Sequence, residues 1–392
     1  MKTSEIRANT KHILFLFTFI TFNFFTQTKS NNCTGDIKIN TQHDLDILEN
    51  CNFYSGTIDI SETTLTRVII PHIKTLHGSF NIKNNTKLVE ISAFALKSTT
   101  NFISVGNLNL TTVSLPKLRI TTKSFEIENA PLLKILLFPR GLLEARNFRV
   151  KRTGINEIIG LNVVAMNTLE LLNNINLDRV SLPKLHSVNL IRIYKNGKSD
   201  FTFEAHNLAA LGESLFQNID TLSLPLLKRA SSSLTFTENT ITRLSIPNLD
   251  QILGSLTITL NPQLESISFP SLNHIGGNLM IDNNPRLWII DQLNELKKVD
   301  NKIQLGGNFS KILFKSLKKF LGDLFIQTST TEITCADFFY LREGGVIVIN
   351  NVKCEFKVEL PDDEHRHEYL IIENDHLWSP FARISNAEIS QK

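Results

Sequence analysis

Four cysteines are the residues of this sequence whose chemistry is easiest to assign. Cys33 and Cys51 lie 18 residues apart near one end, and Cys335 and Cys354 lie 19 residues apart near the other. A zinc site needs closely spaced Cys and His ligands, and the sequence has neither a Cys-x-x-Cys step nor a Cys/His cluster. We therefore expect disulfides. Pairing within each end is favoured among the three connectivities that four cysteines allow, and each bridge would contribute about 3 kcal/mol in the chain-entropy model.

Charged residues of alternating sign recur at steps of 21–23 residues: Glu126, Arg149, Glu170 and Arg192. On stacked strands about 4.8 Å apart, such a row forms a ladder in which each opposite-charge pair contributes about 0.2–1 kcal/mol. A catalytic pair of carboxylates is the alternative. Because each Glu has an Arg beside it, ordinary ionised carboxylates are favoured over the raised pKa of a general acid. We predict a structural charge ladder.

Hydroxyl side chains gather in two neighbouring repeats: Thr235, Thr237, Thr257 and Thr259. Alternate residues of a strand share one face, so these four are expected to form a flat patch. The patch could lie against polysaccharide. The simpler interpretation is that threonine, as a β-branched residue, favours strands.

Sequence motifs for other chemistry are missing. There is no Gly-rich phosphate loop, no G-x-S-x-G step and no H-E-x-x-H step. His365 and His367 stand beside the acidic residues 362–364 and could touch a metal, but a solvated acidic tail is the favoured interpretation. We accordingly predict no catalytic residue, no cofactor-binding residue and no metal ligand.

The first thirty residues have the form of a secretory signal peptide. A basic start precedes an apolar run over residues 13–25, and Thr28 and Ser30 are small residues before a cut after Ser30. The run is shorter than the roughly 20 residues of a membrane-spanning helix. The segment carries the whole excess charge of +3, so nucleic-acid binding through bulk charge is not expected. In a secreted chain, four sequons are candidate N-glycosylation sites: Asn32, Asn84, Asn109 and Asn308.

The body of the chain is a repeat with a period of 21–23 residues and about thirteen copies. Each copy carries a short apolar-x-apolar strand, an Asn shortly after it and, in many copies, an apolar-Pro-x-apolar step such as Leu182–Leu185. The copies near Leu211 and Ile303 fit poorly. One copy cannot bury its apolar side alone, whereas stacked copies place like residues above like residues. No helical period appears between residues 56 and 330, which excludes helical repeats.

This pattern predicts an all-β solenoid, a right-handed coil of the leucine-rich-repeat-like kind with disulfide-capped ends. We expect the solenoid over residues 31–354, with caps at 31–55 and 330–354. Residues 355–392 carry a net charge of −5 and are expected to form an acidic, poorly ordered tail. In the recurring turn, Asn tolerates left-handed backbone geometry and can bond to neighbouring backbone groups.

Three segments resemble a known family: Cys33-Thr34-Gly35-Asp36-Ile37 at the start, Gly277-Asn278-Leu279-Met280-Ile281-Asp282-Asn283-Asn284-Pro285 in the coils, and Cys335-Ala336-Asp337-Phe338-Phe339 at the close. They look like the fungal cell-wall glycoproteins with receptor L-domain-like repeats, over about residues 31–354. Members of that family are usually anchored by glycosylphosphatidylinositol (GPI) and support cell-wall organisation. A yeast branch is sporulation-specific and serves ascospore wall assembly. The many Phe, Asn and Ile residues and the low Ser/Thr content beyond the coils favour that branch.

The resemblance implies a secreted, non-enzymatic glycoprotein of the cell wall, cell surface or spore wall, whose partners would be wall polysaccharides or wall proteins. The sequence departs from the family at its polar end, 386–392, where no GPI signal is visible, so a membrane anchor is not expected from the residues themselves. Two classes of alternative remain, a binding ectodomain and an enzyme. A receptor-like ectodomain for a soluble ligand would show a Cys-rich module between two lobes, and the sequence has no cysteine in its middle. A polysaccharide-binding ectodomain would use the threonine patch. A β-helical polysaccharide-cleaving enzyme would show a cluster of acids without neutralising partners on adjacent coils, which we do not find in the sequence.

Overall fold

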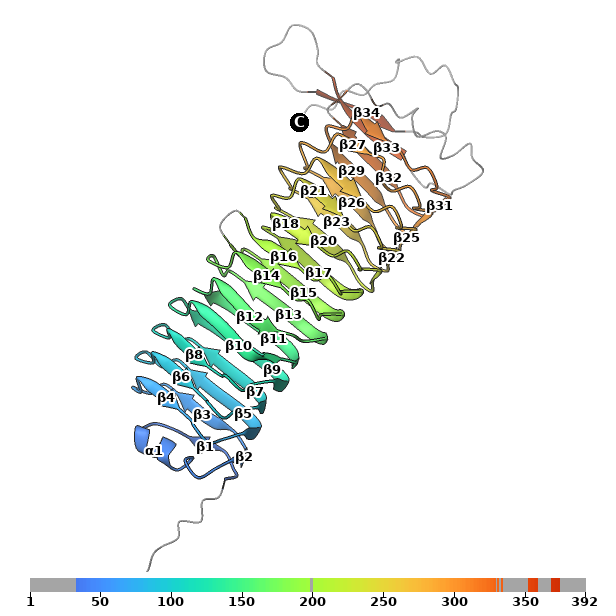
Figure 1. Cartoon of the computed structure of the whole chain (residues 1–392). Helices are drawn as coiled ribbons and strands as arrows, with labels where there is room; N and C mark the ends of the chain where they lie inside the picture. Colours follow the sequence, from blue (N-terminus) through green and yellow to red (C-terminus); the bar gives the residue numbers. More distant parts are fainter. Residues whose placement is uncertain are drawn as a thin grey trace, which may run out of the picture.

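The computed structural model describes residues 33–197, 200–328, 330 and 333, and the backbone of 352–358 and 368–373. It confirms the expected all-β solenoid: about 13 coils stack into a long rod (Figure 1). The signal peptide, Asn32, Cys335 and the acidic and His residues around 362–367 lie outside the described residues. Within the described part, no helix has the length and apolar character needed to cross a membrane.

The principal wall of the rod is one 22-stranded sheet that runs its whole length. Its described strands are β1 (Ile37–Lys38), β2 (Phe53–Ser55), β3 (Ile58–Ser61), β5 (Thr75–Lys83), β7 (Ser98–Val105), β9 (Ile120–Ala130), β11 (Glu144–Thr153), β13 (Ala165–Leu172), β15 (Ser187–Tyr194), β17 (Ala210–Gln217), β19 (Arg229–Ala230), β20 (Leu234–Thr237), β22 (Gln251–Ile252), β23 (Leu256–Thr259), β25 (His274–Ile275), β26 (Leu279–Asp282), β28 (Lys298–Val299), β29 (Ile303–Gly307), β31 (Lys319–Phe320), β32 (Leu324–Thr328), β33 (Val352–Val358) and β34 (Glu368–Glu373). Neighbouring strands of successive coils pair in parallel, as stacking of equivalent segments requires.

Shorter sheets form a second wall, which Figure 1 shows along the opposite long edge from β22, β25 and β31. Three of its strands form one sheet and five form the next, with two pairs after them. The described strands are β4 (Arg67–Ile69), β6 (Glu90–Ser92), β8 (Thr112–Ser114), β10 (Ile135–Leu142), β12 (Glu157–Leu161), β14 (Arg179–Ser181), β16 (Thr202–Glu204), β18 (Thr221–Ser223), β21 (Arg243–Ser245), β24 (Ser266–Ser268), β27 (Ile289–Ile290) and β30 (Lys311–Ile312). Each coil therefore runs from a second-wall strand, through a turn, onto the principal wall and back.

The core is a continuous column between the two walls. Inward residues of each strand alternate with half-exposed ones, as in β3, where Ile58 and Ile60 are buried. Phenylalanines stack along the column: the ring centroids of Phe102 and Phe125 lie 5.0 Å apart with their planes nearly parallel, and Phe125 and Phe148 repeat the arrangement at 5.3 Å. Parallel pairing at fixed register places like side chains above one another, so the aromatic stack follows from the repeat itself.

Asparagine recurs at two adjacent positions of the turn, and its role differs between them. The first position has a left-handed backbone in coil after coil, with φ 53° at Asn84, 56° at Asn129 and 54° at Asn283. The next position points inward and bonds to the neighbouring coil, as Asn261 does through its amide. Asn129 therefore takes no part in the buried ladder, although its Oδ1 accepts a solvent-exposed hydrogen bond of 2.6 Å from Arg152 Nε. Ala130 takes the inward position of that coil and interrupts the asparagine ladder, as Ile219 does further along.

Two coils fit the pattern less simply than the others because polar residues occupy core positions. In β17 the inward pair is Ser214 and Phe216, which pair with Leu234 and Phe236. In β7 the inward pair is Phe102 and Ser104, and Ser104 accepts a hydrogen bond of 3.0 Å from Asn107 Nδ2. The copy at Ile303, by contrast, is regular, since Ile303 and Leu305 are both fully buried.

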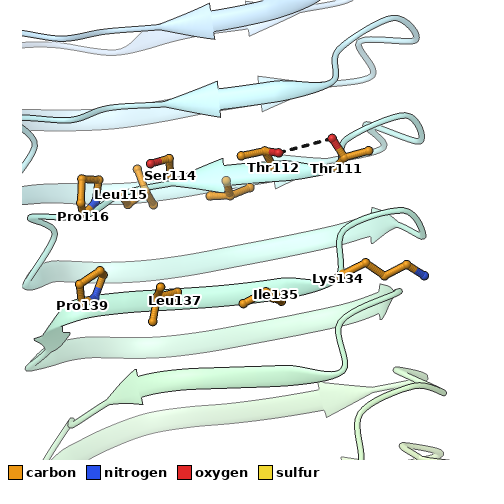
Figure 2. A pocket seen from close by; sticks show the side chains of 10 residues that line it. Thr111, Thr112, Ser114, Leu115, Pro116, Lys134, Ile135, Leu137 and Pro139 are labelled. Atoms are coloured by element: carbon orange, nitrogen blue, oxygen red, sulfur yellow. Dashed lines mark hydrogen bonds between the residues drawn. The ribbon is translucent and has the colours of Figure 1, made fainter.

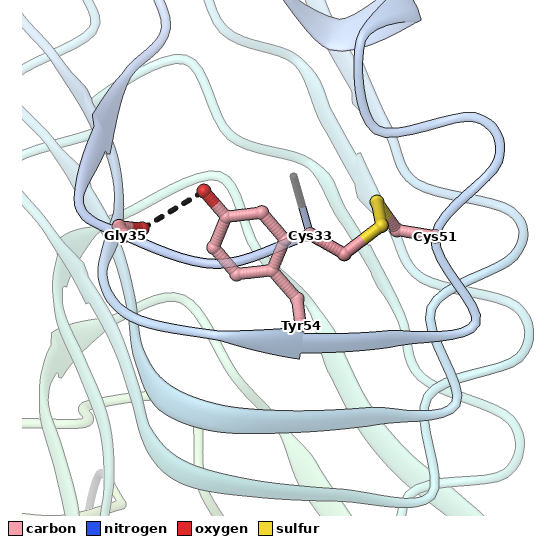
Figure 3. Close-up of a disulfide and its surroundings, with 4 residues drawn as sticks. All are labelled: Cys33, Gly35, Cys51 and Tyr54. Carbon is pink, nitrogen blue, oxygen red and sulfur yellow. Dashed lines mark hydrogen bonds between the residues drawn. A yellow bond between two sulfur atoms is a disulfide. The ribbon is translucent and has the colours of Figure 1, made fainter. Parts of the chain in front are cut away.

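The N-terminal end of the stack is closed by a short cap. Helix α1 (Gln42–Asp46) begins at a capping box between Thr41 and Asp44, in which the Thr41 N–H donates to Asp44 Oδ2 at 2.8 Å. The predicted bridge between Cys33 and Cys51 is present, with a Cα–Cα distance of 5.7 Å (Figure 3). Beside it the Tyr54 hydroxyl donates to the Gly35 carbonyl at 2.9 Å. Together these contacts fasten the first coil to the second.

Removing this bridge should loosen the first coils and leave the middle of the rod intact. For the double variant Cys33→Ala/Cys51→Ala we expect a loss of about 3 kcal/mol in the local stability of the N-terminal cap, since the closed loop is of the length that the chain-entropy model rates at that value. Hydrogen exchange at Ile58 and Ile60 measures it, with Leu169 and Leu171 as internal reference. Unchanged protection at Ile58 would contradict the prediction, and dithiothreitol should lower protection at Ile58 and Ile60 in the wild type but not in the variant.

The sheet continues past residue 354, where the sequence pattern placed the end of the solenoid. Strand β33 spans that boundary and pairs in parallel with β32, and β34 pairs antiparallel with β33. The terminal strand of a parallel stack exposes an unpaired edge, and an antiparallel partner covers it without another full coil. The expected tail thus contains two strands of the principal sheet. The predicted Cys335–Cys354 bridge lies outside the described residues and stays a prediction.

Candidate functional site

The predicted charge ladder lies on the outer face of the principal wall, in four consecutive strands. Register pairs Glu126 with Arg149, Arg149 with Glu170, and Glu170 with Arg192. The ion pairs centre on Glu170, which Arg149 Nε contacts at 3.0 Å and Arg192 at 3.4 Å. The contacts recorded for Arg149 are all with Glu170 rather than with Glu126.

Sequence reasoning missed two members of this cluster. Lys151 Nζ lies 2.9 Å from Glu170 Oε2, and Arg192 also contacts Glu213 at 3.3 Å. Lys151 stands two residues after Arg149 on the same strand, so both side chains share a face and reach the same acid. That period-two spacing was visible in the sequence.

Glu170 is an ionised carboxylate. Partial burial acts to raise the pKa of its carboxyl, but the hydrogen bond and charge of Lys151, together with Arg149, outweigh burial and hold the pKa below the ordinary 4.5. A carboxyl with a lowered pKa is a poor general acid at neutral pH. The cluster is built to hold charges in register on adjacent coils.

Replacing Glu170 with glutamine should therefore cost stability in a pH-dependent way. Because the folded-state pKa is depressed, the ion pairs contribute fully above the unfolded pKa near 4.5, and the contribution is lost as the pH falls through the folded value. We expect Glu170→Gln to destabilise by roughly 1–2 kcal/mol at pH 7 and to differ less from the wild type at pH 3. Thermal melts at both pH values measure this. A deficit that is equal at the two pH values would contradict the prediction.

The predicted hydroxyl patch is also found on the principal wall. Thr235 pairs with Thr257 and Thr237 with Thr259, all partly exposed, and the Thr259 hydroxyl donates to Thr237 Oγ1 at 3.3 Å. Asp282 follows Thr259 in register. Burial raises the pKa of the Asp282 carboxyl, with a hydrogen bond from Asn283 acting the other way. The patch is thus an uncharged, hydrogen-bonding surface ending at one acid, and its role as a polysaccharide contact stays a prediction.

The described sequon asparagines share one corner of the rod. Asn84 follows β5, Asn109 follows β7 and Asn308 follows β29, each in the turn that leads from the principal wall to the second wall. All three side chains are exposed. Glycans attached there would line this one edge, which the sequence alone could not show because it does not place the corner.

Two grooves on the second wall were not foreseen. One lies between β8 and β10, which belong to different sheets, and Figure 2 shows Ile135, Leu137 and Pro139 in a row along one side of it, with Pro116 near Pro139 on the other. Ile135 and Leu137 are 50% and 42% exposed. The other groove lies between β12 and β14, which share one register pair, Glu157 with Arg179. The sequence did contain a sign of the first groove. In the run Ile135–Phe138 every residue is apolar, so apolar side chains must point outward as well as inward from this strand.

No group of three or more His, Cys, Asp or Glu residues suited to a metal ion occurs among the described residues. What the described surface offers is extended and repetitive: paired charges, hydroxyls and shallow apolar grooves along a rod. Such a surface can offer many contacts to a long partner, as solenoid surfaces do.

The chain is similar in sequence to several known fungal proteins of the cell surface and cell wall. The chain is 27% identical over 338 residues to a cell surface GPI-anchored protein of Arthroderma benhamiae, covering 86% of each chain. It is 29% identical to the cell wall protein ecm33 of Schizosaccharomyces pombe, over 85% of this chain and 78% of that one. It is 28% identical to sporulation-specific protein 22 of Saccharomyces cerevisiae, over 81% of this chain and 69% of that one.

The expected resemblance is therefore confirmed: over most of its length the chain is homologous to fungal cell-wall and GPI-anchored surface proteins, among them sporulation-specific ones. No family model matches the chain. No solved structure matches it either.

Proposed function

We propose that this protein is a secreted, non-enzymatic glycoprotein of the fungal cell surface that supports organisation of the cell wall. The homology to cell wall proteins across the length of the rod carries the proposal. The proposal applies to the solenoid as a whole, because the aligned region of 338 residues is as long as the stack of coils.

The non-enzymatic part of the proposal is supported by the state of the acids on the principal wall. A polysaccharide-cleaving site needs two carboxyls whose environments push their pKa values apart. In the charge ladder, Glu170 contacts three cations and has a lowered pKa. Asp282 has a raised pKa, but its register neighbours on the two preceding coils are the threonines Thr259 and Thr237. Neither supplies the second carboxyl that such a site needs.

Two experiments test the proposal. Deleting the gene in its fungus should raise the sensitivity of the wall to wall-binding dyes and to wall-digesting enzymes, and a tagged copy should fractionate with the wall. Purified protein incubated with wall glucans and chitin should release no new reducing ends. Release that disappears in Asp282→Asn would overturn the non-enzymatic part, and a wall indistinguishable from the wild type would overturn the wall role.

A role in ascospore wall assembly is the finer form of this proposal. The specific support is the similarity to sporulation-specific proteins 22 and 2 of Saccharomyces cerevisiae, at 28% and 24% identity. The tagged copy should then accumulate in spores rather than in vegetative cells, and the deletion defect should be confined to the spore wall. A defect confined to vegetative walls would contradict the finer form and leave the wall role standing.

A polysaccharide-binding ectodomain is the second candidate function, favoured by the threonine patch. Pull-down with insoluble glucan or chitin that is lost in Thr235→Val/Thr257→Val, two isosteric changes that remove hydroxyls, would favour it. Equal recovery of wild type and variant would count against it.

A further inference from the structure

Ion pairs between adjacent coils recur along this rod. Cations of the second wall reach carboxylates one coil away, and so do those of the principal wall. The recorded pairs on the second wall are Arg67–Glu90 at 3.2 Å, Arg179–Glu204 at 2.7 Å and Lys311–Asp291 at 3.2 Å. Stacked like charges on neighbouring strands repel, so a protein of this shape is stabilised by alternating them.

Three cations stack on consecutive coils of the described chain without forming such an ion pair. Lys74, Lys97 and Arg119 occupy the same place in three consecutive coils, where the turn after the second wall meets the principal wall. The Lys97 N–H donates to the Lys74 carbonyl at 2.8 Å, and the Arg119 N–H donates to the Lys97 carbonyl at 2.9 Å, which fixes the stacking. All three side chains are exposed. We call this line the basic ridge.

The side chains of the basic ridge form no ion pair with a described residue, and the nearest acid in the next coil is Glu144, whose N–H donates to the Arg119 carbonyl at 3.2 Å. No ion pair or side-chain hydrogen bond is recorded there for Lys74, Lys97 or Arg119. Lys117, in the same turn as Arg119, adds a fourth cation. Further along the same edge the equivalent residue is Lys297, and it does form an ion pair, with Glu295 at 3.9 Å.

We propose that the basic ridge binds an acidic polysaccharide laid along the axis of the rod. The cations are one coil apart, about 4.8 Å, which is close to the length of one sugar unit in an extended chain. A polymer with one carboxylate or phosphate on each unit therefore offers an anion to each coil. Exposed Lys and Arg heads bind either anion through charge-assisted hydrogen bonds.

The predicted glycans would not obstruct such a polymer. The sequon asparagines Asn84 and Asn109 precede the second-wall strands β6 and β8, whereas Lys97 and Arg119 follow these same strands. A second-wall strand thus separates the glycan edge from the basic ridge in every coil concerned. The ridge ends at Leu143, an exposed apolar residue whose N–H donates to the Arg119 carbonyl at 2.8 Å.

This inference rests on the proposed wall function only in taking the acidic polymer to come from the cell wall. Binding itself can be measured with purified protein and polymers, independently of that function. Polygalacturonate and a phosphorylated mannan serve as carboxylated and phosphorylated probes. Fully methyl-esterified polygalacturonate is the neutral match, and a single-stranded DNA oligonucleotide of equal charge is the other polyanion. We expect the purified wild type to bind both acidic polymers, with binding that weakens steeply as salt is raised, and not to bind the neutral ester.

The ridge variant Lys74→Gln/Lys97→Gln/Arg119→Gln should bind the acidic polymers roughly tenfold or more weakly, since three charge contacts are lost. The control variant Lys38→Gln/Lys87→Gln/Lys134→Gln loses the same charge from exposed positions off the ridge and should bind like the wild type. The ridge variant should melt no lower than the wild type, because like-charge repulsion is relieved.

Three results would overturn the inference: equal weakening in the control variant, equal binding of the neutral ester, or tighter binding of DNA than of both acidic polymers. The tighter of the two acidic polymers identifies the anionic group. A wall defect on gene deletion combined with failed binding would reject this inference while leaving the proposed function intact.

Discussion

Replacing Phe125 with alanine should destabilise the rod by roughly 3–5 kcal/mol, the largest effect we expect from one substitution. Phe125 is fully buried and lies at the centre of the aromatic column. Its ring stacks between Phe102 and Phe148 and meets the edge of Phe138 at 5.2 Å. The substitution removes three ring contacts and leaves a cavity that neighbouring coils cannot close, because their register is set by the sheet.

Phe94→Ala is the matched control, since Phe94 is 43% exposed and should cost less than about 1 kcal/mol. Urea unfolding followed by far-ultraviolet circular dichroism measures both variants. We also expect the unfolding of Phe125→Ala to lose cooperativity, because each coil contacts only its neighbours and a weak coil divides the stack. Similar midpoints for the two variants would show that the aromatic column contributes little.

Replacing Asn261 with alanine should cost about 2–4 kcal/mol, since it leaves buried polar groups on two coils without partners. Asn261 is fully buried. Its Oδ1 accepts from the N–H of Asn239 at 2.9 Å and from Asn239 Nδ2 at 3.0 Å, and its Nδ2 donates to Asn284 Oδ1 at 2.9 Å. One side chain thus links three coils.

Asn248→Ala is the control for the ladder. Asn248 also bonds to the preceding coil, through a single 2.7 Å hydrogen bond to the Pro225 carbonyl, but the bond is exposed to water. We expect a cost of about 0.5–1 kcal/mol there. Hydrogen exchange at Phe236 and Ile258 reports the local effect for both variants. Comparable loss of protection in the two would mean that burial adds nothing to the asparagine ladder.

The ladder and the aromatic column bear on function through stiffness. A rod that presents the threonine patch, the grooves and the basic ridge at fixed spacing offers a long partner many contacts at once. Its breaks at Ala130 and Ile219 divide the ladder into three segments. Thr153 begins the middle segment, where its N–H donates to Asn174 Oδ1 at 3.2 Å.

The repeat could be recognised from sequence because its signals are local and periodic. Inward residues such as Ile58 and Ile60 alternate with outward ones, and the period of 21–23 residues places each copy above the last. Parallel stacking then dictates that Glu126, Arg149, Glu170 and Arg192 lie side by side. The Cys33–Cys51 bridge followed from its short separation at an end that must be closed.

Other features could be recognised only from the tertiary structure, because they depend on how one coil contacts the next. Asn129 and Asn174 look alike in the sequence, yet Asn129 sets a turn with a partly exposed side chain and Asn174 belongs to the buried ladder, since they occupy adjacent positions of the turn. In the apolar run at Ile135 the sequence does not show which residues point inward. Its position on a groove became visible only from the structure, where β8 and β10 belong to different sheets.

What the sequence determined by itself was the periodic part of this protein: its winding, its core and the rows that stacking creates. What the tertiary structure decided was which member of each row meets a partner. Glu170 rather than Glu126 gathers the cations, whereas Lys74, Lys97 and Arg119 line up without forming an ion pair among the described residues. The physical reason is that backbone register follows from local pattern, whereas pairing depends on side-chain reach across neighbouring coils.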